Sequence, residues 1–426
     1  MSIYKRQSEA DLVDLHHKPR GRLIALTGAR QCGKSTLASL SFPHYPVISL
    51  DSPVERVVYE KITPQEWITL YPRAIIDEAQ KMPSVFDTLK ACYDRQPDVR
   101  YVVLGSSQIR LLKGIKETLA GRIAVRELFP FNLPELSVEK PGDPVGPSRL
   151  VELLKSGTPD RSLSSLFPQT FSLSAAYART QSRWAYFQRW GGMPALLAPD
   201  WGDQDRFEWL TDYHTTYLQR DLADLARLDR LEPFVRAQKA AAMRTAQTIN
   251  YSELARLSEV SSPTAQQFMR YLEISYQVTL LPAWFRNHEK RLAKQSKLHF
   301  LDPGIRRAIL QMTGAVQGLE YESAVVAEIV KQCRTLRLPV SFYHLRTNDG
   351  REIDLVIERE DGFFVFEIKQ TGHVHSSDFR HLRGLEGLFD KPLLLGAVIS
   401  EDTTVAPYDG AATRLWSLPA SMLLGC

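Results

Sequence analysis

The sequence predicts an α/β protein of two to three domains, whose N-terminal part is a parallel sheet with helices on both faces. Two observations lead to this prediction. The chain has 426 residues, which is too long for one compact core. Over about the first 135 residues, short apolar runs alternate with longer stretches of helical spacing. Strands that alternate with helices along a chain form parallel sheets covered on both faces.

The predicted N-terminal strands are five apolar runs, and a helix with apolar residues at helical spacing is expected among them. The strands lie at Leu23–Thr27, Val47–Asp51, Ala74–Asp77, Tyr101–Gly105 and Ile123–Leu128, and the helix at Val85–Tyr93.

The middle of the chain has a different pattern. Residues 141–176 are rich in Pro, Gly and Ser, and we expect a connector or an irregular insertion there. Helical patterning follows, and residues 250–281 then predict a helix-turn-helix with a strand that can serve as a wing. Its second helix is expected to begin with Ser262 as N-cap and Pro263 at the first helical position, and Val278–Leu281 is the strand.

Strand patterns return after Pro339. The strands are expected at residues 341–345, 351–358, 362–369 and 392–400, with helices at Tyr321–Val330 and Ser377–Leu388. We therefore expect four regions: an N-terminal domain (1–140), a connector and helical region (141–230), a winged-helix-like region (231–300) and a C-terminal α/β domain (301–426).

Composition restricts the class of protein. The chain is 44% hydrophobic and 24% charged, and its formal net charge of +4 permits a nucleic-acid partner without arguing for one. It has no run of about 18 apolar residues, and its polar N-terminus has no signal-peptide core. The four cysteines form no CxxC pair, which fits a reducing compartment. We expect a cytoplasmic protein with no membrane partner.

A phosphate-binding loop is the most specific motif. GARQCGKS, from Gly28 to Ser35, matches G-x-x-x-x-G-K-[ST], with an apolar strand before it and a helix-compatible run at Thr36–Leu40 after it. The alternative is a glycine turn that enters a helix. In the first interpretation, main-chain N–H groups bind the phosphates of ATP, Lys34 reaches the β- and γ-phosphates, and Ser35 ligates Mg²⁺. The expected nucleotide-binding residues are Gly28, Ala29, Arg30, Gln31, Cys32, Gly33, Lys34, Ser35, Thr36, Asp77 and Ser107.

Two carboxylates follow the predicted strand at residues 74–77. Asp77 is expected to hold Mg²⁺, and Glu78 to orient or deprotonate the attacking water; alternatively, both are solvated acids at an ordinary strand end. Ser107 follows another strand and either senses the γ-phosphate or caps the next helix. Arg122 is either an arginine finger, in its own or a neighbouring subunit, or a structural arginine.

A second polar group lies on two consecutive C-terminal strands. Glu367 and Lys369 are two residues apart and share a strand face, and Asp354 lies on the preceding strand. With Glu322 from a predicted helix, the carboxylates would suit Mg²⁺ or Mn²⁺, and Lys369 would position water or steady a phosphate. The alternative is a cross-strand salt bridge on a solvated face, which the apolar neighbours Phe364–Phe366 disfavour.

Taken together, the motifs resemble those of prokaryotic AAA-type ATPases (AAA+ superfamily) with a C-terminal restriction-endonuclease-like domain of unknown function. The resemblance extends over nearly the whole chain, in the same order. Its segments are GARQCGKST, AIIDEAQ, VVLGSSQ, LAGR, GGMP (Gly191–Pro194), YLQRDL (Tyr217–Leu222), KLHFLDPGI (Lys297–Ile305) and REIDLVIE…FEIK.

The resemblance implies a Walker-type ATPase, a winged-helix region and a PD-(D/E)XK-like domain. Asp354, Glu367 and Lys369 match the nuclease signature, with Glu322 as the helix acid. Two functions are therefore expected. One is an ATPase that couples nucleotide state to DNA binding or metal-dependent cleavage of nucleic acid. The other is a nucleotide-switched regulator that binds DNA or protein and has a silent nuclease-like domain. A homo-oligomer is also expected, and the basic stretch Arg286–Lys297 suits phosphate contacts or is a solvated loop.

Overall fold

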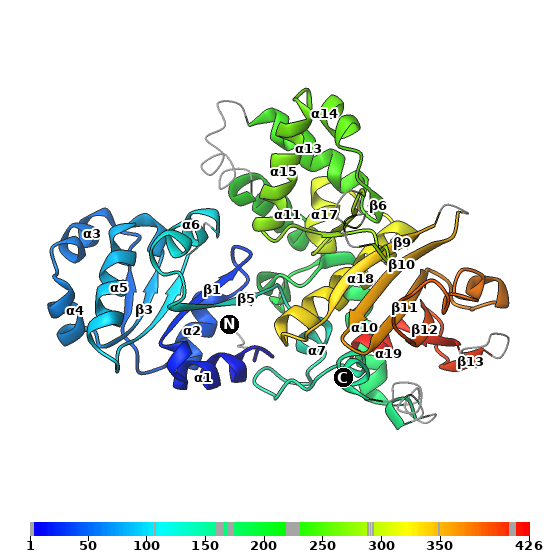
Figure 1. Ribbon diagram of the computed structural model, residues 1–426, viewed down its shortest axis with the longest axis horizontal. Coiled ribbons are helices and arrows are strands. Elements are labelled where there is room, and N and C mark those ends of the chain that lie inside the picture. Colours follow the sequence, from blue (N-terminus) through cyan, green and yellow to red (C-terminus); the bar gives the residue numbers. More distant parts are fainter. Residues whose placement is uncertain are drawn as a thin grey trace.

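The computed structural model describes residues 4–105, 108–157, 163, 165–168, 174–218, 231–287, 289, 291, 294–347, 350–408 and 415–426. Figure 1 shows the N-terminal sheet and its helices in blue and cyan at the left, a group of green helices above the centre, and a second sheet in yellow to red at the right. Among these residues, no helix has the length and hydrophobicity that crossing a bilayer requires.

The N-terminal part is a five-stranded sheet in which every strand pair is parallel, as predicted, with strand order β2-β3-β4-β1-β5. Its central strands are buried along their length because helices cover both faces, which explains the uninterrupted apolar runs. The strands are β1 (Leu23–Gly28), β2 (Val47–Ser49), β3 (Arg73–Asp77), β4 (Arg100–Leu104) and β5 (Ile123–Leu128). The helices are α1 (Glu9–His17), α2 (Lys34–Ser41), α3 (Pro53–Glu60), α4 (Pro64–Leu70), α5 (Ser84–Arg95) and α6 (Gln108–Thr118).

Helices then connect the two sheets. They are α7 (Leu133–Leu136), α8 (Arg149–Lys155), α10 (Ala175–Trp190), α11 (Asp203–Asp212) and a π-helical segment, η5 (Tyr213–Leu218). Helix α8 lies inside the stretch expected to be a connector, and it is ordered because Leu150, Leu153 and Leu154 enter the core. Residues 219–222 of the YLQRDL motif lie outside the described residues.

In the described part of residues 232–300, helices pack on a small antiparallel sheet. The helices α13 (Glu232–Met243), α14 (Tyr251–Ser258) and α15 (Ser262–Ile274) pack on strands β6 (Gln247–Thr248), β8 (Lys297–Phe300) and β7 (Val278–Leu281), in that spatial order. Both helices and the strand expected at 250–281 are present. The predicted cap was wrong by one residue: the Ser261 side chain, rather than that of Ser262, accepts the hydrogen bond from the Thr264 amide.

The C-terminal part is a six-stranded mixed sheet of order β13-β14-β12-β11-β10-β9. The strands are β9 (Ser341–Arg346), β10 (Glu352–Arg359), β11 (Gly362–Lys369), β12 (Leu393–Ser400), β13 (Ala406–Tyr408) and β14 (Leu415–Pro419); the helices are α17 (Pro303–Ile309), α18 (Gly318–Thr335) and α19 (Ala420–Leu424). The helix expected at Ser377–Leu388 was wrong. A short 3₁₀ helix (Ser376–Phe379) and turns replace it, because Gly384 has a φ of +66° and Gly387 further weakens helical propensity.

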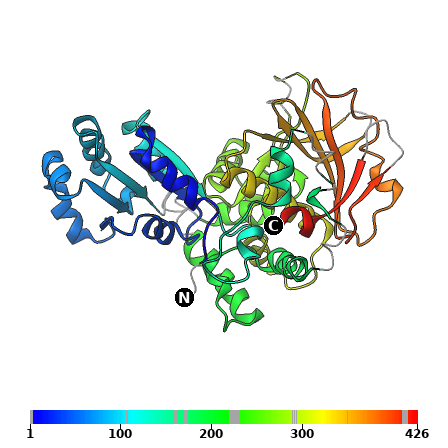
Figure 2. The ribbon, with the colours of Figure 1, turned by 90° about the horizontal axis from the view of Figure 1, so that it is seen from below.

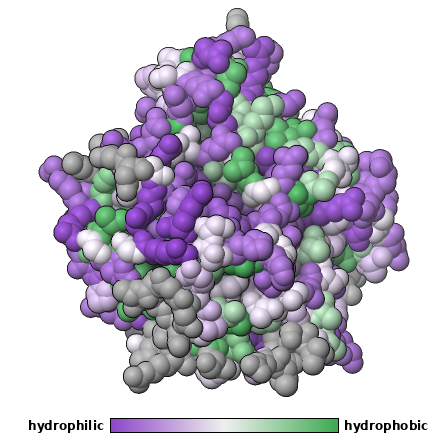
Figure 3. Space-filling view, turned by 90° about the vertical axis from the view of Figure 1, so that its right-hand side faces the viewer, coloured by the Kyte–Doolittle hydropathy of each residue, from purple (hydrophilic) through white to green (hydrophobic). Residues whose placement is uncertain are grey.

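Helix α18 joins the two parts. All but three of its residues are buried, and Figures 1 and 2 place it between the N-terminal and C-terminal sheets. One apolar core includes residues from every layer around it, such as Leu26, Leu37, Val325, Phe364 and Leu423. The face of the C-terminal part that points away from the N-terminal sheet is seen in Figure 3. It is mostly hydrophilic with small scattered hydrophobic areas.

Candidate nucleotide site and carboxylate cluster

The predicted phosphate loop runs from the end of β1 into α2, as the motif requires. Gly28 has a φ of +146°, and a Cβ at that position would lie 1.9 Å from the Leu128 main-chain oxygen. Gly33 has a φ of +96° and is the N-cap of α2. Both positions therefore need glycine. Ala29 and Cys32 are buried, whereas Gln31 and Thr36 are exposed and Arg30 is half-buried.

The side chains expected to bind phosphate and metal lie together at the loop. Lys34 Nζ donates hydrogen bonds to the main-chain oxygens of Gly28 at 3.1 Å and Ala29 at 2.7 Å. Ser35 Oγ donates to Asp77 Oδ2 at 2.8 Å, although the two residues lie on α2 and β3. Parallel strands all end at one edge of the sheet, so the end of β3 meets the start of α2 there.

Glu78 directly follows this carboxylate in a left-handed conformation with a φ of 55°. Its amide donates to Asp77 Oδ1 at 2.9 Å, and Gln80 Nε2 donates to its Oε2 at 2.5 Å. A non-glycine residue in this conformation is held by its surroundings, and such residues cluster at functional sites. Ser107, expected beside this group, lies outside the described residues.

Arg122 does not lie at its own phosphate loop. It precedes β5, whose residue Ile123 pairs with Leu23 at the start of β1, whereas the loop follows the end of β1. Arg122 forms a two-pronged ion pair with Asp94, through Nε at 2.8 Å and Nη2 at 3.0 Å. The role as an arginine finger within the same chain was therefore wrong, because the parallel register puts Arg122 at the opposite sheet edge.

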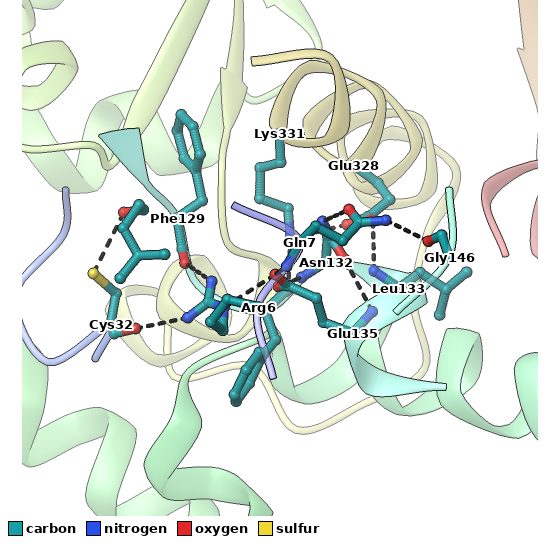
Figure 4. Close-up of polar contacts among 12 residues, drawn as sticks. Arg6, Gln7, Cys32, Phe129, Asn132, Leu133, Glu135, Gly146, Glu328 and Lys331 are labelled. Carbon is teal, nitrogen blue, oxygen red and sulfur yellow. Dashed lines mark hydrogen bonds and ion pairs between the residues drawn. The ribbon is translucent and has the colours of Figure 1, made fainter. Parts of the chain in front are cut away.

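Two residues that the sequence did not single out hold the loop from outside. Figure 4 shows Arg6 between the loop and the segment after β5: its Nη1 donates to the Cys32 oxygen at 2.9 Å, and its Nε to Glu135 Oε1 at 3.0 Å. The Tyr213 hydroxyl donates to the Arg30 oxygen at 2.9 Å. Arg6 and Glu135 are both buried. No local motif marks such contacts, since their partners are distant in sequence.

A cavity of about 260 Å³ opens beside the loop. Gly33 and Thr36 border it, and most of the remaining wall is apolar, including Leu37, Phe131 and Leu197. Its position next to the start of α2 leaves room for an apolar or aromatic group attached to a bound phosphate chain.

The residues expected to form the C-terminal cluster do come together. The antiparallel register that pairs Leu355 with Phe366 places Asp354 opposite Glu367. Lys369 Nζ contacts Glu367 Oε1 at 2.7 Å, as residues on one strand face should. Glu322 reaches the cluster from α18. Asp354, Glu322 and Glu367 are all buried, so the alternative of a salt bridge on a solvated face was wrong.

Burial and charge repulsion raise the pKa of two of these acids. Desolvation and the nearby Asp354 raise the pKa of Glu322 to about 8 and that of Glu367 to about 7. Among the described residues, no three His, Cys, Asp or Glu side chains are arranged to hold a metal ion.

Lys297 is the cluster residue that the sequence did not identify. The basic stretch Arg286–Lys297 was expected to contact phosphate or to be a solvated loop, yet the Lys297 side chain is only 2% exposed. Its Nζ lies 2.6 Å from Glu322 Oε1 and 2.9 Å from Asp354 Oδ1. Arg291 of the same stretch is also buried and pairs with Glu358 at 3.0 Å.

The glycines of the GGMP motif contact the KLHFLDPGI motif. The Gly192 amide donates to Asp302 Oδ2 at 2.9 Å, and Asp302 also caps α17 through the Ile305 amide. A Cβ on Gly191 would lie 1.9 Å from the Asp302 carboxylate. These two motifs therefore form a packing joint between α10 and α17.

Comparisons with known proteins divide the chain into three segments. Residues 20–137 match the family described as AAA domain; residues 181–315 and 317–420 match two domains of unknown function, DUF8612 and DUF4143. Uncharacterized proteins of Mycobacterium tuberculosis and Mycobacterium bovis are each 29% identical over 377 residues, which is 87% of this chain and 75% of theirs.

Solved structures give looser likenesses. A Walker-type ATPase of Pyrococcus abyssi aligns over 72% of this chain and 96% of its own, with 15% identity and a TM-score of 0.44. The ORC2 protein of Aeropyrum pernix, in its ADP form, aligns over 76% and 94% with 13% identity and a TM-score of 0.29. Both TM-scores lie below 0.5, so neither alignment indicates a shared overall arrangement. The match of residues 20–137 to the family described as AAA domain agrees with the phosphate-loop geometry in the same part of the chain.

Proposed function

We propose that the chain binds ATP with Mg²⁺ at the phosphate loop and hydrolyses it. The contact between Ser35 Oγ and Asp77 Oδ2 carries the proposal, because it brings together from two elements the hydroxyl and the carboxylate that a phosphate-loop magnesium site uses. These hard oxygen ligands fit Mg²⁺. When bound there, the ion would neutralise charge on the β- and γ-phosphates.

The residues of the chain supply the remaining steps. Loop amides between Gly28 and Gly33 bind phosphate oxygens at the start of α2. Lys34 turns from the loop carbonyls to the β- and γ-phosphates, and Glu78, held by Gln80, orients the attacking water. The adenine base takes the apolar cavity beside Gly33.

Two variants test this function. We expect Lys34→Ala to lose both ATP binding and turnover. Glu78→Gln should bind ATP normally but turn it over at least about 100-fold more slowly, because it cannot act as a base. Asp87→Asn, which changes an exposed acid on α5, is the matched control. Turnover in Lys34→Ala at the wild-type rate would refute the proposal, as would normal turnover in Glu78→Gln.

A second part of the proposal is nucleotide-dependent DNA binding by the winged-helix-like region 231–300. The exposed face of α15 carries Gln266, Gln267 and Arg270, which are side-chain types that contact base edges and phosphates. We expect Arg270→Ala to weaken DNA binding and reduce its salt dependence, measured by fluorescence anisotropy with and without ATP. If no salt-dependent DNA binding is measured, we expect the region to bind a protein partner instead.

Cleavage of nucleic acid by Asp354, Glu367 and Lys369 is a separate expectation. The convergence of these residues supports it, but the position of Lys297 argues against a Mg²⁺ or Mn²⁺ ion between them. A C-terminal domain that does not cleave is consistent with a nucleotide-switched regulator.

A further inference from the structure

Lys297 is fixed at the C-terminal cluster by the backbone that carries it. It begins β8, where it pairs with Thr248 of β6 on one side and Leu281 of β7 on the other. Two strands therefore hold its Cα in place. The side chain leaves this small sheet and enters the carboxylate cluster of β10 and α18.

The ammonium group satisfies three acids at once. It lies 2.6 Å from Glu322, 2.9 Å from Asp354 and 3.5 Å from Glu352. A lysine ammonium has three N–H donors and no acceptor; one donates to Asp354 Oδ1, and Glu322 and Glu352 lie within ion-pair distance. Burying a lysine is costly unless it is paired in this way. The ammonium group is therefore a buried cation surrounded by acids.

The same contacts occupy several of the oxygens that a divalent metal would use. The first Asp354 oxygen accepts from Lys297, and the second accepts from the Ile368 amide at 2.9 Å. Glu367 Oε1 is paired with Lys369. Mg²⁺ needs oxygen ligands at about 2.0–2.1 Å in octahedral geometry, and the Lys297 Nζ stands between the two acids that would supply them. The residues do not fit the metal that the family resemblance implies.

We propose that Lys297 is a built-in cation that takes the place of a divalent metal ion in the C-terminal carboxylate cluster. The cluster then binds neither Mg²⁺ nor Mn²⁺, and the domain does not cleave nucleic acid through it. This inference is independent of ATP hydrolysis, since it concerns no residue of the phosphate loop.

The test is a Mn²⁺ titration of the full chain, read by electron paramagnetic resonance without nucleotide. The chain carries Asp77→Asn throughout, so that the proposed ATP-site metal does not contribute. We expect that Asp354→Asn will not reduce the amount of Mn²⁺ that the chain binds. Lys297→Met should gain about one Mn²⁺ per chain, since it frees the Asp354 and Glu322 oxygens to act as ligands, and adding Asp354→Asn should abolish that gain.

Lys331→Met is the matched control, because Lys331 is equally buried and also paired with a glutamate, Glu328, but outside the cluster. It should gain no Mn²⁺. The proposal would be overturned if the protein with Lys297 intact bound Mn²⁺ and lost it with Asp354→Asn. It would also be overturned if Lys297→Met folded but gained no Mn²⁺. If Lys297→Met does not fold, the comparison of Lys297 proteins with and without Asp354→Asn still decides.

A second readout is cleavage of plasmid DNA, single-stranded DNA and RNA in Mg²⁺ or Mn²⁺. We expect none from the protein with Asp77 intact, with or without ATP. Cleavage that disappears in Asp354→Asn would overturn the proposal. Failure of the ATPase test would leave both of these readouts unchanged, so the two proposals are distinguishable.

Discussion

The Tyr213 hydroxyl donates a hydrogen bond to the main-chain oxygen of Arg30 at 2.9 Å, across 183 residues of sequence. The tyrosine is buried and its ring stacks on Trp209 at 5.2 Å. A residue of the helical region therefore fixes a turn of the phosphate loop. The N-terminal sheet and its helices therefore do not shape the phosphate loop alone.

Removing this hydroxyl should weaken nucleotide binding. Tyr213→Phe keeps the stacked ring but deletes one hydrogen bond, which is worth about 1 kcal/mol. Because the free loop becomes less well ordered, we expect ATP affinity to fall up to about fivefold in a fluorescent-nucleotide titration. Thr69→Val is the control, since the Thr69 hydroxyl also donates to a main-chain oxygen, that of Gln65, within α4. An equal loss in both variants would contradict the assignment.

Removing one partner of the buried pair Arg6–Glu135 should destabilise the protein strongly. Arg6→Met removes the charge partner of Glu135, leaves the Cys32 oxygen without this donor, and should lower the free energy of unfolding by about 3 kcal/mol. Urea denaturation measures this. Lys113→Met, which breaks an exposed pair with Glu117, should have no measurable effect. Equal midpoints for Arg6→Met and the parent would show that Glu135 needs no partner.

The lowered pKa of His16 leads us to expect that the stability of the protein depends on pH. Burial lowers the pKa of His16 from 6.5 to about 4, and its Nδ1 lies 2.8 Å from the Gly21 oxygen. Between these pH values the unfolded chain binds a proton that the folded chain does not. Stability should therefore decrease as the pH falls from about 6.5 to about 4, by roughly 3 kcal/mol in total.

His16→Gln isolates this contribution. Denaturation at a series of pH values should give a shallower slope in that interval for the variant than for the parent. An identical slope would mean that His16 has the same pKa in the folded and the unfolded chain.

Nucleotide binding should change the hydrogen exchange of main-chain amides in α18. Leu133 donates its amide to Glu328 at 2.5 Å, and Lys331 donates to the Phe131 oxygen at 3.0 Å, so two residues of α18 hold the segment that Arg6 ties to the loop (Figure 4). We expect ATP to slow hydrogen exchange of the α18 amides, because ordering the loop stabilises its neighbours. Lys34→Ala should show no such change. Slowing confined to the loop would contradict this coupling.

The N-terminal fold and its site were predictable because their signals are local. A buried parallel strand is a continuous apolar run, and the phosphate loop has a fixed spacing. The contact between Ser35 and Asp77 follows once both lie at one sheet edge. The strand order and the position of Arg122 required the register, which no local pattern gives.

Other features depend on distant partners and were missed. Lys297 is the last residue of a basic stretch, and only its burial beside Asp354 and Glu322 shows that it is internal. Arg6 is one of several basic residues near the N-terminus. The helix expected at 377–388 has good apolar spacing, but the glycines at 384 and 387 favour turns there.

The apolar core shared by α2, α18 and α19 limits how this chain can change over generations. An ATPase domain on a flexible tether can be exchanged between genes, because its surface is complete. Here Leu133 and Phe131 rely on side chains of α18, and Ser148 pairs with Gln332 of the same helix. A recombinant that joined this N-terminal half to a foreign C-terminal half would expose Val325 and its neighbours and leave buried charges unmatched. We therefore expect the two halves to be inherited together, with substitutions on one side of α18 followed by compensating substitutions on the other.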